Sequence, residues 1–425
     1  MSLPEDFAAA PVPDGATVRG LQIAMVITGI GATLPMFTLG TRIAGALGLG
    51  AAAGVAVAAC GLVAVLGMLT SVVGARCRVS TYQILAFSFG VRGAQLINLM
   101  LAIMLIGWFA TTADMLGGAV QHAVAGLWEW GHDSPKWIYT LGALVLMTLT
   151  GIFGFHVMEH FARVTVPLLT ALMAYVVWLS ISQNGLAPAL ARVCDHSLSV
   201  MDAMSSVIGA IVLTAVLAPD LTRYARDDRN ALVSVLGVAL GYPAALLLAA
   251  VPAAVYGKHD IMDVMTLLRI PGIAIVILVV STWTSNTSNL YSATLTLATL
   301  FPQRSTRVLG LWGAVIALGA ALAGIADYFI PLLIVLGILS APLAGVYVVD
   351  FFVLRRGAYA TVAVRGGALA AWGLGSVCGL VGTYSGHSLT RIPAVDSILI
   401  AAAGHVLLNA ARLRRQPVRS PGSVP

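Results

Sequence analysis

The chain alternates long apolar runs with short polar breaks. A helix needs roughly 20 mostly apolar residues to cross the hydrocarbon of a bilayer. Cutting the chain at its charged and Pro/Gly-rich breaks predicts about twelve such helices. We place these spans at 19–47, 50–75, 94–121, 137–156, 158–183, 200–217, 231–256, 270–301, 306–325, 328–352, 361–384 and 393–412. The pattern predicts an all-α integral membrane protein.

No soluble segment interrupts the spans. We expect an arm at 1–18, a single transmembrane domain at 19–412 and a polar tail at 413–425. The composition agrees, because 59% of the residues are hydrophobic and 9% are charged, against about 25% charged residues in soluble domains. The net charge of +6 does not indicate nucleic-acid binding, since no basic face with aromatic residues is visible.

The basic residues predict the orientation in the membrane. An even number of spans places both termini on one side, and cytoplasmic loops carry an excess of Lys and Arg. With both termini inside, all but six of the 23 Lys and Arg residues are cytoplasmic. The six are Arg42, Lys136, Arg192, Lys258, Arg269 and Arg391. We therefore expect a multi-pass protein of the cell (inner) membrane with cytoplasmic termini; residues 1–18 do not resemble a signal peptide.

Two spans contain helix-breaking residues. The first has Gly29, Gly31 and Pro35 within one helix length, and the sixth has Gly209 at its middle and Pro219 just past its end. Interrupted helices at matching positions of two halves are typical of inverted-repeat transporters, with the binding site near the membrane midplane. The alternative is that Gly and Pro are simply common in membrane helices.

The eighth span is unusually polar. At helical spacing its hydroxyls form one stripe, Ser281, Thr284, Ser285, Ser288 and Ser292, and a second stripe carries Thr282, Asn286, Asn289 and Thr296. Small hydroxylated residues often join helices to one another, but two intramembrane asparagines favour a ligand or ion site. The adjacent hydroxyls of Thr284 and Ser285 suit a hard monovalent cation, together with carbonyls freed where a neighbouring helix unwinds.

The third span carries a tryptophan near the membrane centre. Leu105, Trp108, Phe109 and Thr112 share one face of this helix. Tryptophan usually lies at the membrane interface, so an indole near the centre indicates a stacking surface for a ligand, with plain packing as the alternative.

Asp114 lies on the opposite side of the same helix, in its outer half. We expect a structural ion pair, with Arg42 as the candidate partner, rather than contact with a substrate. No nucleophile motif, metal-ligand spacing or P-loop is present, so neither an enzyme nor an ATP-driven pump is indicated, and we expect no cofactor other than a coupling ion.

Several short motifs resemble the nucleobase:cation symporters of the NCS1 family, and most closely its cytosine-permease branch. They are FSFGVRG at Phe87–Gly93, GWF at Gly107–Phe109, APDLTRY at Ala218–Tyr224 and WTSN at Trp283–Asn286. The resemblance covers nearly the whole chain in the same order. It implies the LeuT-like architecture of two inverted five-helix repeats, at 19–183 and 200–352, followed by two further helices at 361–412.

The resemblance also implies a sodium site and a substrate slot. The sodium ligands would be the carbonyls of Gly29, Ala32 and Ser281 and the hydroxyls of Thr284 and Ser285. Trp108 would be the aromatic platform under a flat heterocycle. The expected slot is lined by Trp108, Leu105, Phe109, Thr112, Ala210, Ile211, Ser281 and Asn286.

The slot departs from that of cytosine permease. That branch of the family has a glutamine where this chain has Leu105, a serine–phenylalanine pair where it has Ala210 and Ile211, and an asparagine where it has Ser281. Losing hydrogen-bond partners in a polar site costs discrimination on the order of 10⁴-fold. We therefore expect a ring less polar than cytosine.

The predicted function is sodium-coupled symport of a nucleobase-like or related small planar nitrogen heterocycle by alternating access. One alternative is proton-coupled symport of a heterocyclic vitamin precursor, with Asp114 as the titratable group. A second is a transport-deficient membrane sensor, which the depleted substrate slot keeps open. The expected partners are the heterocycle, sodium or a proton, and the lipid bilayer.

Overall fold

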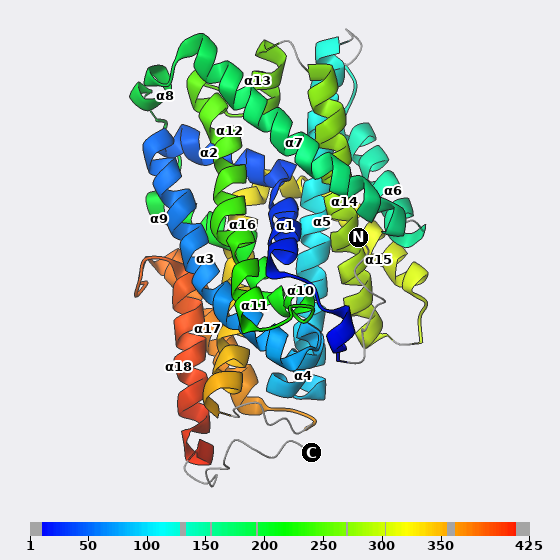
Figure 1. The fold of residues 1–425 in the computed structure, drawn as a ribbon, viewed down its shortest axis with the longest axis vertical. Coiled ribbons are helices and arrows are strands. Elements are labelled where there is room, and N and C mark those ends of the chain that lie inside the picture. The colour runs from blue at the N-terminus through cyan, green and yellow to red at the C-terminus, as the bar shows by residue number, and fades with distance from the viewer. Residues whose placement is uncertain are drawn as a thin grey trace.

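The computed structural model describes residues 11–127, 133–153, 155–192, 194–268, 271–301, 303–354 and 362–413. Within these ranges every regular element is a helix, apart from one isolated bridge between Val18 and Ala225. The helices run mainly along the long axis of the molecule (Figure 1). The all-α class expected from the sequence is confirmed.

The expected spans correspond to helices or broken helices. They are α1 (Gly20–Gly31) with α2 (Leu34–Leu47), α3 (Leu49–Cys77), α5 (Val91–Leu127), α6 (Lys136–Phe153), α7 (Phe155–Asn184), α9 (Val200–Val216) with α10 (Ala218–Thr222), α11 (Asp228–Ser234) with η3 (Gly237–Gly241) and α12 (Tyr242–Tyr256), α14 (Pro271–Leu300), α15 (Thr306–Leu322), α16 (Phe329–Val349), α17 (Gly366–Ser385) and α18 (Pro393–Leu413). Shorter elements lie between them: η1 (Asp14–Ala16), α4 (Thr81–Phe89), α8 (Ala187–Ala191), α13 (Ile261–Leu267), η4 (Ile325–Tyr328) and η5 (Asp350–Leu354). Among the described residues, six helices are long and apolar enough to cross a membrane, or seven if α1 and α2 form one broken span.

The first span is broken where the sequence predicts. The axes of α1 and α2 meet at 67°, with Ala32 and Thr33 between them and Pro35 in the first turn of α2. Proline suits the first turn of a helix, where its missing N–H leaves no bond unmade. The break therefore agrees with the sequence.

The sixth span, whose interruption the sequence left open, is not broken at Gly209. Helix α9 runs unbroken through Gly209 and ends at Val216. Leu217 separates it from the short α10. A β-carbon on Gly209 would lie 1.8 Å from the carbonyl oxygen of Leu333 in α16. The glycine is thus required for close packing of two helices, and not for unwinding.

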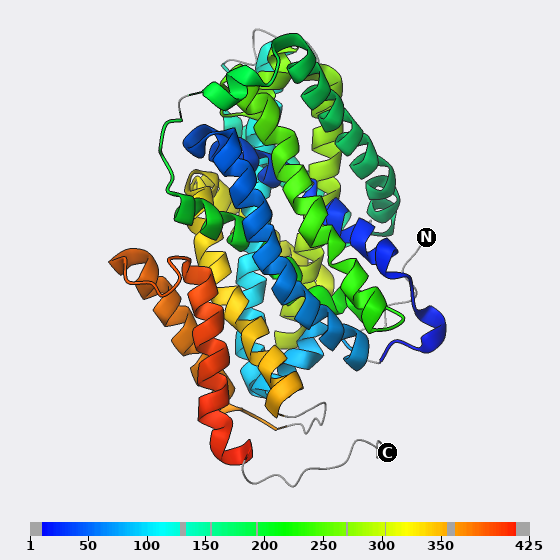
Figure 2. The same ribbon diagram turned by 60° about the vertical axis from the view of Figure 1, so that its left-hand side comes forward.

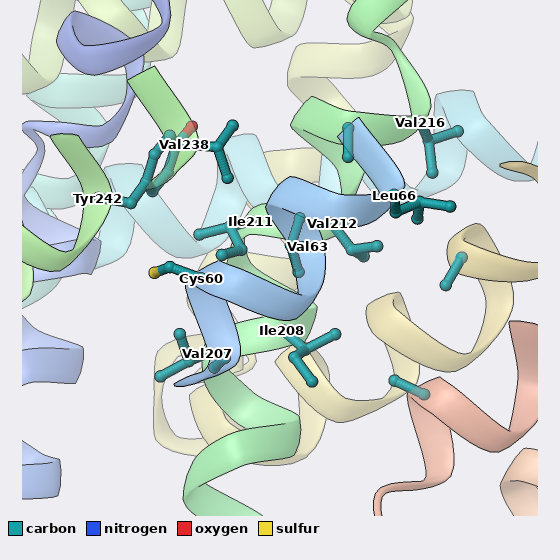
Figure 3. Packing of buried hydrophobic residues seen from close by; sticks show 14 of the residues in the cluster. Cys60, Val63, Leu66, Val207, Ile208, Ile211, Val212, Val216, Val238 and Tyr242 are labelled. Carbon is teal, nitrogen blue, oxygen red and sulfur yellow. The ribbon is translucent and has the colours of Figure 1, made fainter. Parts of the chain in front are cut away.

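The helices form two main packing groups. The bundle comprises α1, α2, α3, α9, α10, α11, η3 and α12, and the scaffold comprises α5, α6, α14 and α15. Each element packs mainly within its own group except α9, which also packs closely against α16. Figure 2 shows α3 and α12 of the bundle side by side. The bundle core lies between α3 and α9, where Cys60 and Val63 meet Val207, Ile208 and Val212 (Figure 3). Helices α16, α17 and α18 pack together, with α16 also against α9.

One end of the molecule is rich in arginine, and Arg76, Arg78, Arg223 and Arg229 lie there; we call it the arginine-rich end. The N-terminal arm is part of the fold at this end. The N–H of Val12 donates to the carbonyl of Arg78 (3.0 Å), and the N–H of Val18 donates to the carbonyl of Tyr224 (2.7 Å).

Two of the family-like motifs build this end. Oδ1 of Asp220, in APDLTRY, accepts the backbone N–H of Thr81 at the start of α4 (2.7 Å). In FSFGVRG, Gly90 has a φ of 81° and a β-carbon there would lie 2.9 Å from the carbonyl oxygen of Val362. Only glycine suits this combination of positive φ and close backbone approach. These motifs are therefore structural junctions.

Candidate substrate and ion site

Trp108 lies where the scaffold meets its neighbours. Its half-buried indole is 6.4 Å, centroid to centroid, from the ring of Phe329, at an interplanar angle of 49°. Phe329 is fully buried at the start of α16. The guanidinium carbon of Arg42, in α2, lies 6.0 Å from the centroid of the same ring. Side chains of α5, α16 and α2 therefore meet around one phenyl ring.

The residues expected on one face of α5 lie in two different environments. Leu105 and Phe109 are buried in a hydrophobic cluster that also contains Leu34 and Phe37 of α2. Trp108 packs instead against the bundle core. Thr112, one helical turn beyond Trp108, is 3% exposed, and its Oγ1 has no hydrogen-bond partner among the described residues. Of this face, Trp108 and Thr112 have the features expected of a binding surface.

The two expected slot residues of α9 also differ. Ala210 is half-buried. Ile211 is fully buried and lies in the core near Cys60 and Val63 of α3 (Figure 3). Of the pair, Ala210 is thus the residue with surface available to a ligand.

Asn286 joins three scaffold helices to one another. Its Nδ2 donates to the carbonyl of Phe109 in α5 (3.0 Å) and to Sδ of Met147 in α6 (3.3 Å). Its Oδ1 accepts from Nδ2 of Asn289 (3.0 Å). The side chain is 1% exposed. The hydrogen bonds of Asn286 match the alternative in which polar residues of α14 join helices to one another. Asn289 differs: it is half-buried, and its Oδ1 has no partner among the described residues.

Trp283 of the WTSN motif has a similar role. Its Nε1 donates to Oγ1 of Thr150 in α6 (2.9 Å), and that hydroxyl lies 3.3 Å from Oγ1 of Thr287. These bonds fix α14 against α6, so the polar content of α14 is partly explained by packing within the scaffold.

The broken span contains backbone carbonyls expected to bind sodium. At the end of α1 the N–H of Ala32 is shared between the carbonyls of Thr28 (3.2 Å) and Gly29 (3.3 Å), and the N–H of Thr33 donates to Gly31 (3.0 Å). Such long, shared bonds leave the Gly29 carbonyl with capacity for a further partner, since each carbonyl oxygen has two lone pairs. The break therefore suits a cation ligand set.

The hydroxyl half of that set lies on α14. Ser285 is half-buried, and its hydroxyl makes no hydrogen bond to the described part of the chain. The backbones of Ser281 and Thr284 are helical, but their side chains lie outside the described residues. Because α1 belongs to the bundle and α14 to the scaffold, the expected sodium ligands are divided between the two groups.

The expected partner of Asp114 was wrong. Nζ of Lys136 lies 2.8 Å from Oδ1 of Asp114, and Oγ1 of Thr140 donates to the same oxygen (3.1 Å). Both partners come from α6, which follows α5 directly in the chain and packs against it. Arg42 instead lies over Phe329. The ion pair joins α5 to α6.

Two aromatic residues near the site were not anticipated. Phe329 begins α16 beside Trp108. Tyr242 lies under the break of the first span, where a β-carbon on Gly31 would be 3.1 Å from its ring, and its hydroxyl lies 2.8 Å from Oγ1 of Thr214. Neither residue belongs to a motif; Tyr242 directly precedes Pro243, and Phe329 lies two residues before Pro331, each in an otherwise apolar run.

Residues 12–397 match a family of permeases for cytosine/purines, uracil, thiamine and allantoin. The chain belongs to this family. The cytosine permease of Escherichia coli (strain K12) is 29% identical over 417 residues, covering 96% of this chain and 95% of that protein. The hydantoin permease of Microbacterium maritypicum is 27% identical over 298 residues, covering 63% of this chain and 59% of that protein. The recognised resemblance to the NCS1 family is confirmed, and the chain is a multi-pass membrane permease rather than an enzyme.

Solved structures of Mhp1, described as a nucleobase-cation-symport-1 family transporter, have the same fold. The closed form with bromovinylhydantoin bound has a TM-score of 0.80 at 17% identity, covering 99% of this chain and 98% of that one. The inward-facing form has a TM-score of 0.83, also at 17% identity, covering 99% and 96%. These likenesses confirm the LeuT-like fold of this permease. The limits of its two repeats stay predictions.

Proposed function

We propose that this permease carries a small planar nitrogen heterocycle across the cell membrane in symport with sodium. The observation that carries the proposal is the position of Trp108, a half-buried indole in contact with Phe329 beside α2 and α16. An indole face of this kind binds a flat ring by stacking. The names of the relatives, cytosine permease and hydantoin permease, support a substrate of this class.

The slot favours a ring held with few hydrogen bonds. Leu105 offers no polar atom and is buried, and Ala210 offers only a methyl group. Thr112 supplies one hydroxyl near Trp108. For the ring itself, stacking and shape would therefore contribute more of the binding free energy than hydrogen bonds do, which argues against cytosine.

The division of the expected sodium ligands supports the proposal of sodium coupling. Gly29 and Ala32 belong to the bundle, and Thr284 and Ser285 belong to the scaffold. An ion bound by both groups stabilises the arrangement in which they are close, so its binding is linked to the conformational equilibrium. Asp114, the titratable group of the proton-coupled alternative, is bonded to Lys136 and Thr140, which supports a structural role.

The proposed orientation places the arginine-rich end in the cytoplasm, with both termini there. Arg76, Arg78, Arg223 and Arg229 then lie inside, as the positive-inside rule expects. The opposite end, with α8 and α13 (Figure 1), then faces outward.

The test is uptake by the purified protein in proteoliposomes. A panel of radiolabelled nucleobases, hydantoins and related heterocycles is offered with an inward sodium gradient, a proton gradient or neither, and protein-free liposomes serve as the control. We expect accumulation of at least one heterocycle that requires the sodium gradient. Accumulation driven by the proton gradient in sodium-free buffer would establish the proton-coupled alternative. If heterocycles bind but none accumulates under any gradient, the sensor alternative holds.

A further inference from the structure

We propose that the substrate carries an acidic group and that Arg42 binds it. The inference rests on the proposed function, because it concerns the same slot. Arg42 lies in α2, the half of the broken span nearer the predicted outer face, and its side chain is half-buried. Within the described ranges its guanidinium makes no ion pair and no hydrogen bond, and its contact is the ring of Phe329.

An unpaired guanidinium inside a membrane protein is unusual. Burial of a charge is costly unless a partner compensates it, and intramembrane charges generally pair or mark a substrate path. Two other cations at the same end have partners: Lys136 is paired with Asp114, and Nη2 of Arg192 donates to the carbonyl of Val255 (3.1 Å). The five N–H donors of Arg42 are therefore available to a ligand anion.

The position of Arg42 relates it to the stacking surface. Trp108 and Arg42 both lie beside the ring of Phe329, so the indole and the guanidinium neighbour the same phenyl ring. Thr112, whose buried Oγ1 has no partner in the described chain, follows Trp108 by one turn toward the end where Arg42 lies. In the proposed slot, an aromatic face, a hydroxyl and a guanidinium would follow one another from the inside outward.

This order fits a planar ring that carries a carboxylate. The ring would stack on Trp108 and the carboxylate would point outward to Arg42. A guanidinium binds a carboxylate through two parallel N–H···O bonds, which adds geometric selectivity to the charge attraction. Phe329, which lies beside Trp108 in this structure, would then have to turn away from the indole when substrate enters.

The competing explanation is an ion pair within the protein. Asp327 lies two residues before Phe329 and is exposed, with Oδ2 3.0 Å from the position that a β-carbon on Gly324 would take. In another conformation Asp327 is a possible partner for Arg42, and the charge of the substrate would then be irrelevant. The Asp327→Asn variant separates the two explanations.

The test measures binding by isothermal titration calorimetry of the full chain in nanodiscs with sodium present. Two pairs of probes are used: uracil and orotate, which is uracil with a ring carboxylate, and hydantoin and its acetic acid derivative. We expect the wild type to prefer the acid of at least one pair by roughly tenfold or more, as for a hydrogen-bonded charge pair. Arg42→Gln should remove that preference and leave the affinity for the neutral member within about twofold of wild type.

Arg391→Gln is the matched control. It removes the same charge from the same predicted face, in the exposed loop between α17 and α18, and should leave the preference unchanged, as should Asp327→Asn. Arg42→Lys should retain part of the preference. Melting temperatures establish that each variant is folded.

Four results would overturn the inference. If the wild type prefers the neutral member of both pairs, the acidic group is not recognised. If Arg42→Gln weakens both members equally, or Asp327→Asn reproduces its effect, Arg42 acts by packing or as a gate; in these cases the proposed function stands. If no probe binds to any variant and the broader uptake panel is also negative, the proposed function fails together with the inference.

Discussion

Nζ of Lys136 lies 2.8 Å from Oδ1 of Asp114, and the two side chains differ in access to water. The Asp114 side chain is 3% exposed, whereas that of Lys136 is 41% exposed. The charge of the buried carboxylate therefore depends on the ion pair for compensation, whereas the ammonium group of the lysine can also be solvated by water. The pair also explains how a carboxylate is tolerated inside a membrane helix.

The asymmetry predicts different costs for removing each partner. Lys136→Met leaves a buried carboxylate with only the Thr140 hydroxyl, and should lower the free energy of unfolding by about 3 kcal/mol. Asp114→Asn leaves a lysine that can reach water, and should cost only about 1 kcal/mol. Thermal unfolding in nanodiscs measures both. A larger loss for Asp114→Asn would contradict this account, and a changed pH dependence of uptake in that variant would indicate proton coupling.

The break in the first span and the packing at Gly209 show how much of the fold can be predicted from the sequence. Proline at position 35 has no N–H and restricts its neighbours, so the break near Gly31 is a local consequence of residue types. Gly209 also resembles a helix-breaking residue in the sequence. Its glycine is required for a different reason, because the carbonyl of Leu333 on another helix lies against it. Such an approach depends on how two distant segments pack, which helical periodicity does not encode.

The candidate site shows the same limit. The pattern identified Trp108 and the polar stripe of α14, because residue type and depth in a span are readable from the chain. It did not decide which polar groups face a ligand and which join helices. Asn286 bonds to α5 and α6, and Arg42 lies over Phe329 rather than beside Asp114. Both outcomes depend on helix rotation and on neighbours that are far away in sequence.

Asn286 and its neighbour Asn289 provide a matched pair for stability. Asn286→Ala removes the bonds to Phe109 and Met147 and should lower the free energy of unfolding by about 1–2 kcal/mol. Asn289→Ala removes only the bond to Asn286, so it should cost less than half as much. Thermal unfolding without substrate measures the difference. Equal losses would show that the bonds from α14 to α5 and α6 contribute little.

Close packing of α9 on α16 predicts a large effect at Gly209. Gly209→Ala places a methyl group 1.8 Å from the Leu333 carbonyl oxygen, and separating the helices should cost about 2–3 kcal/mol. Gly61→Ala is the control, because nothing lies within 4 Å of a β-carbon there and alanine favours a helix by about 1 kcal/mol. Melting temperatures should fall for the first variant and hold or rise for the second. An unaffected Gly209→Ala protein would mean that α9 and α16 are not in close contact.

The sodium proposal predicts that stabilisation by sodium depends on some hydroxyls of one stripe of α14 and not on others. Thr284→Ala and Ser285→Ala should each abolish the rise in melting temperature that sodium produces, because a ligand that binds only the folded state stabilises it. Ser288→Ala is the matched control, since Ser288 lies on the same stripe but is exposed. The measurement compares melting in sodium and potassium chloride at equal ionic strength. If the Thr284/Ser285 double variant keeps the wild-type response, the ion binds elsewhere.

The substitution of Trp108 tests whether the substrate is held by stacking. Stacking of a base on an aromatic side chain contributes about 1–3 kcal/mol in nucleic-acid sites, so Trp108→Ala should weaken binding of the transported heterocycle by at least tenfold, or about 1.4 kcal/mol. Trp108→Phe should retain much of the affinity, because an aromatic face remains. Phe329→Leu is the control for packing: it removes the ring that Trp108 contacts in the structure but leaves the indole in place. Isothermal titration calorimetry in nanodiscs with sodium gives the affinities. Equal losses in Trp108→Ala and Trp108→Phe would mean that the shape or the N–H of the indole binds the substrate, and no loss in either would mean that Trp108 only packs against Phe329.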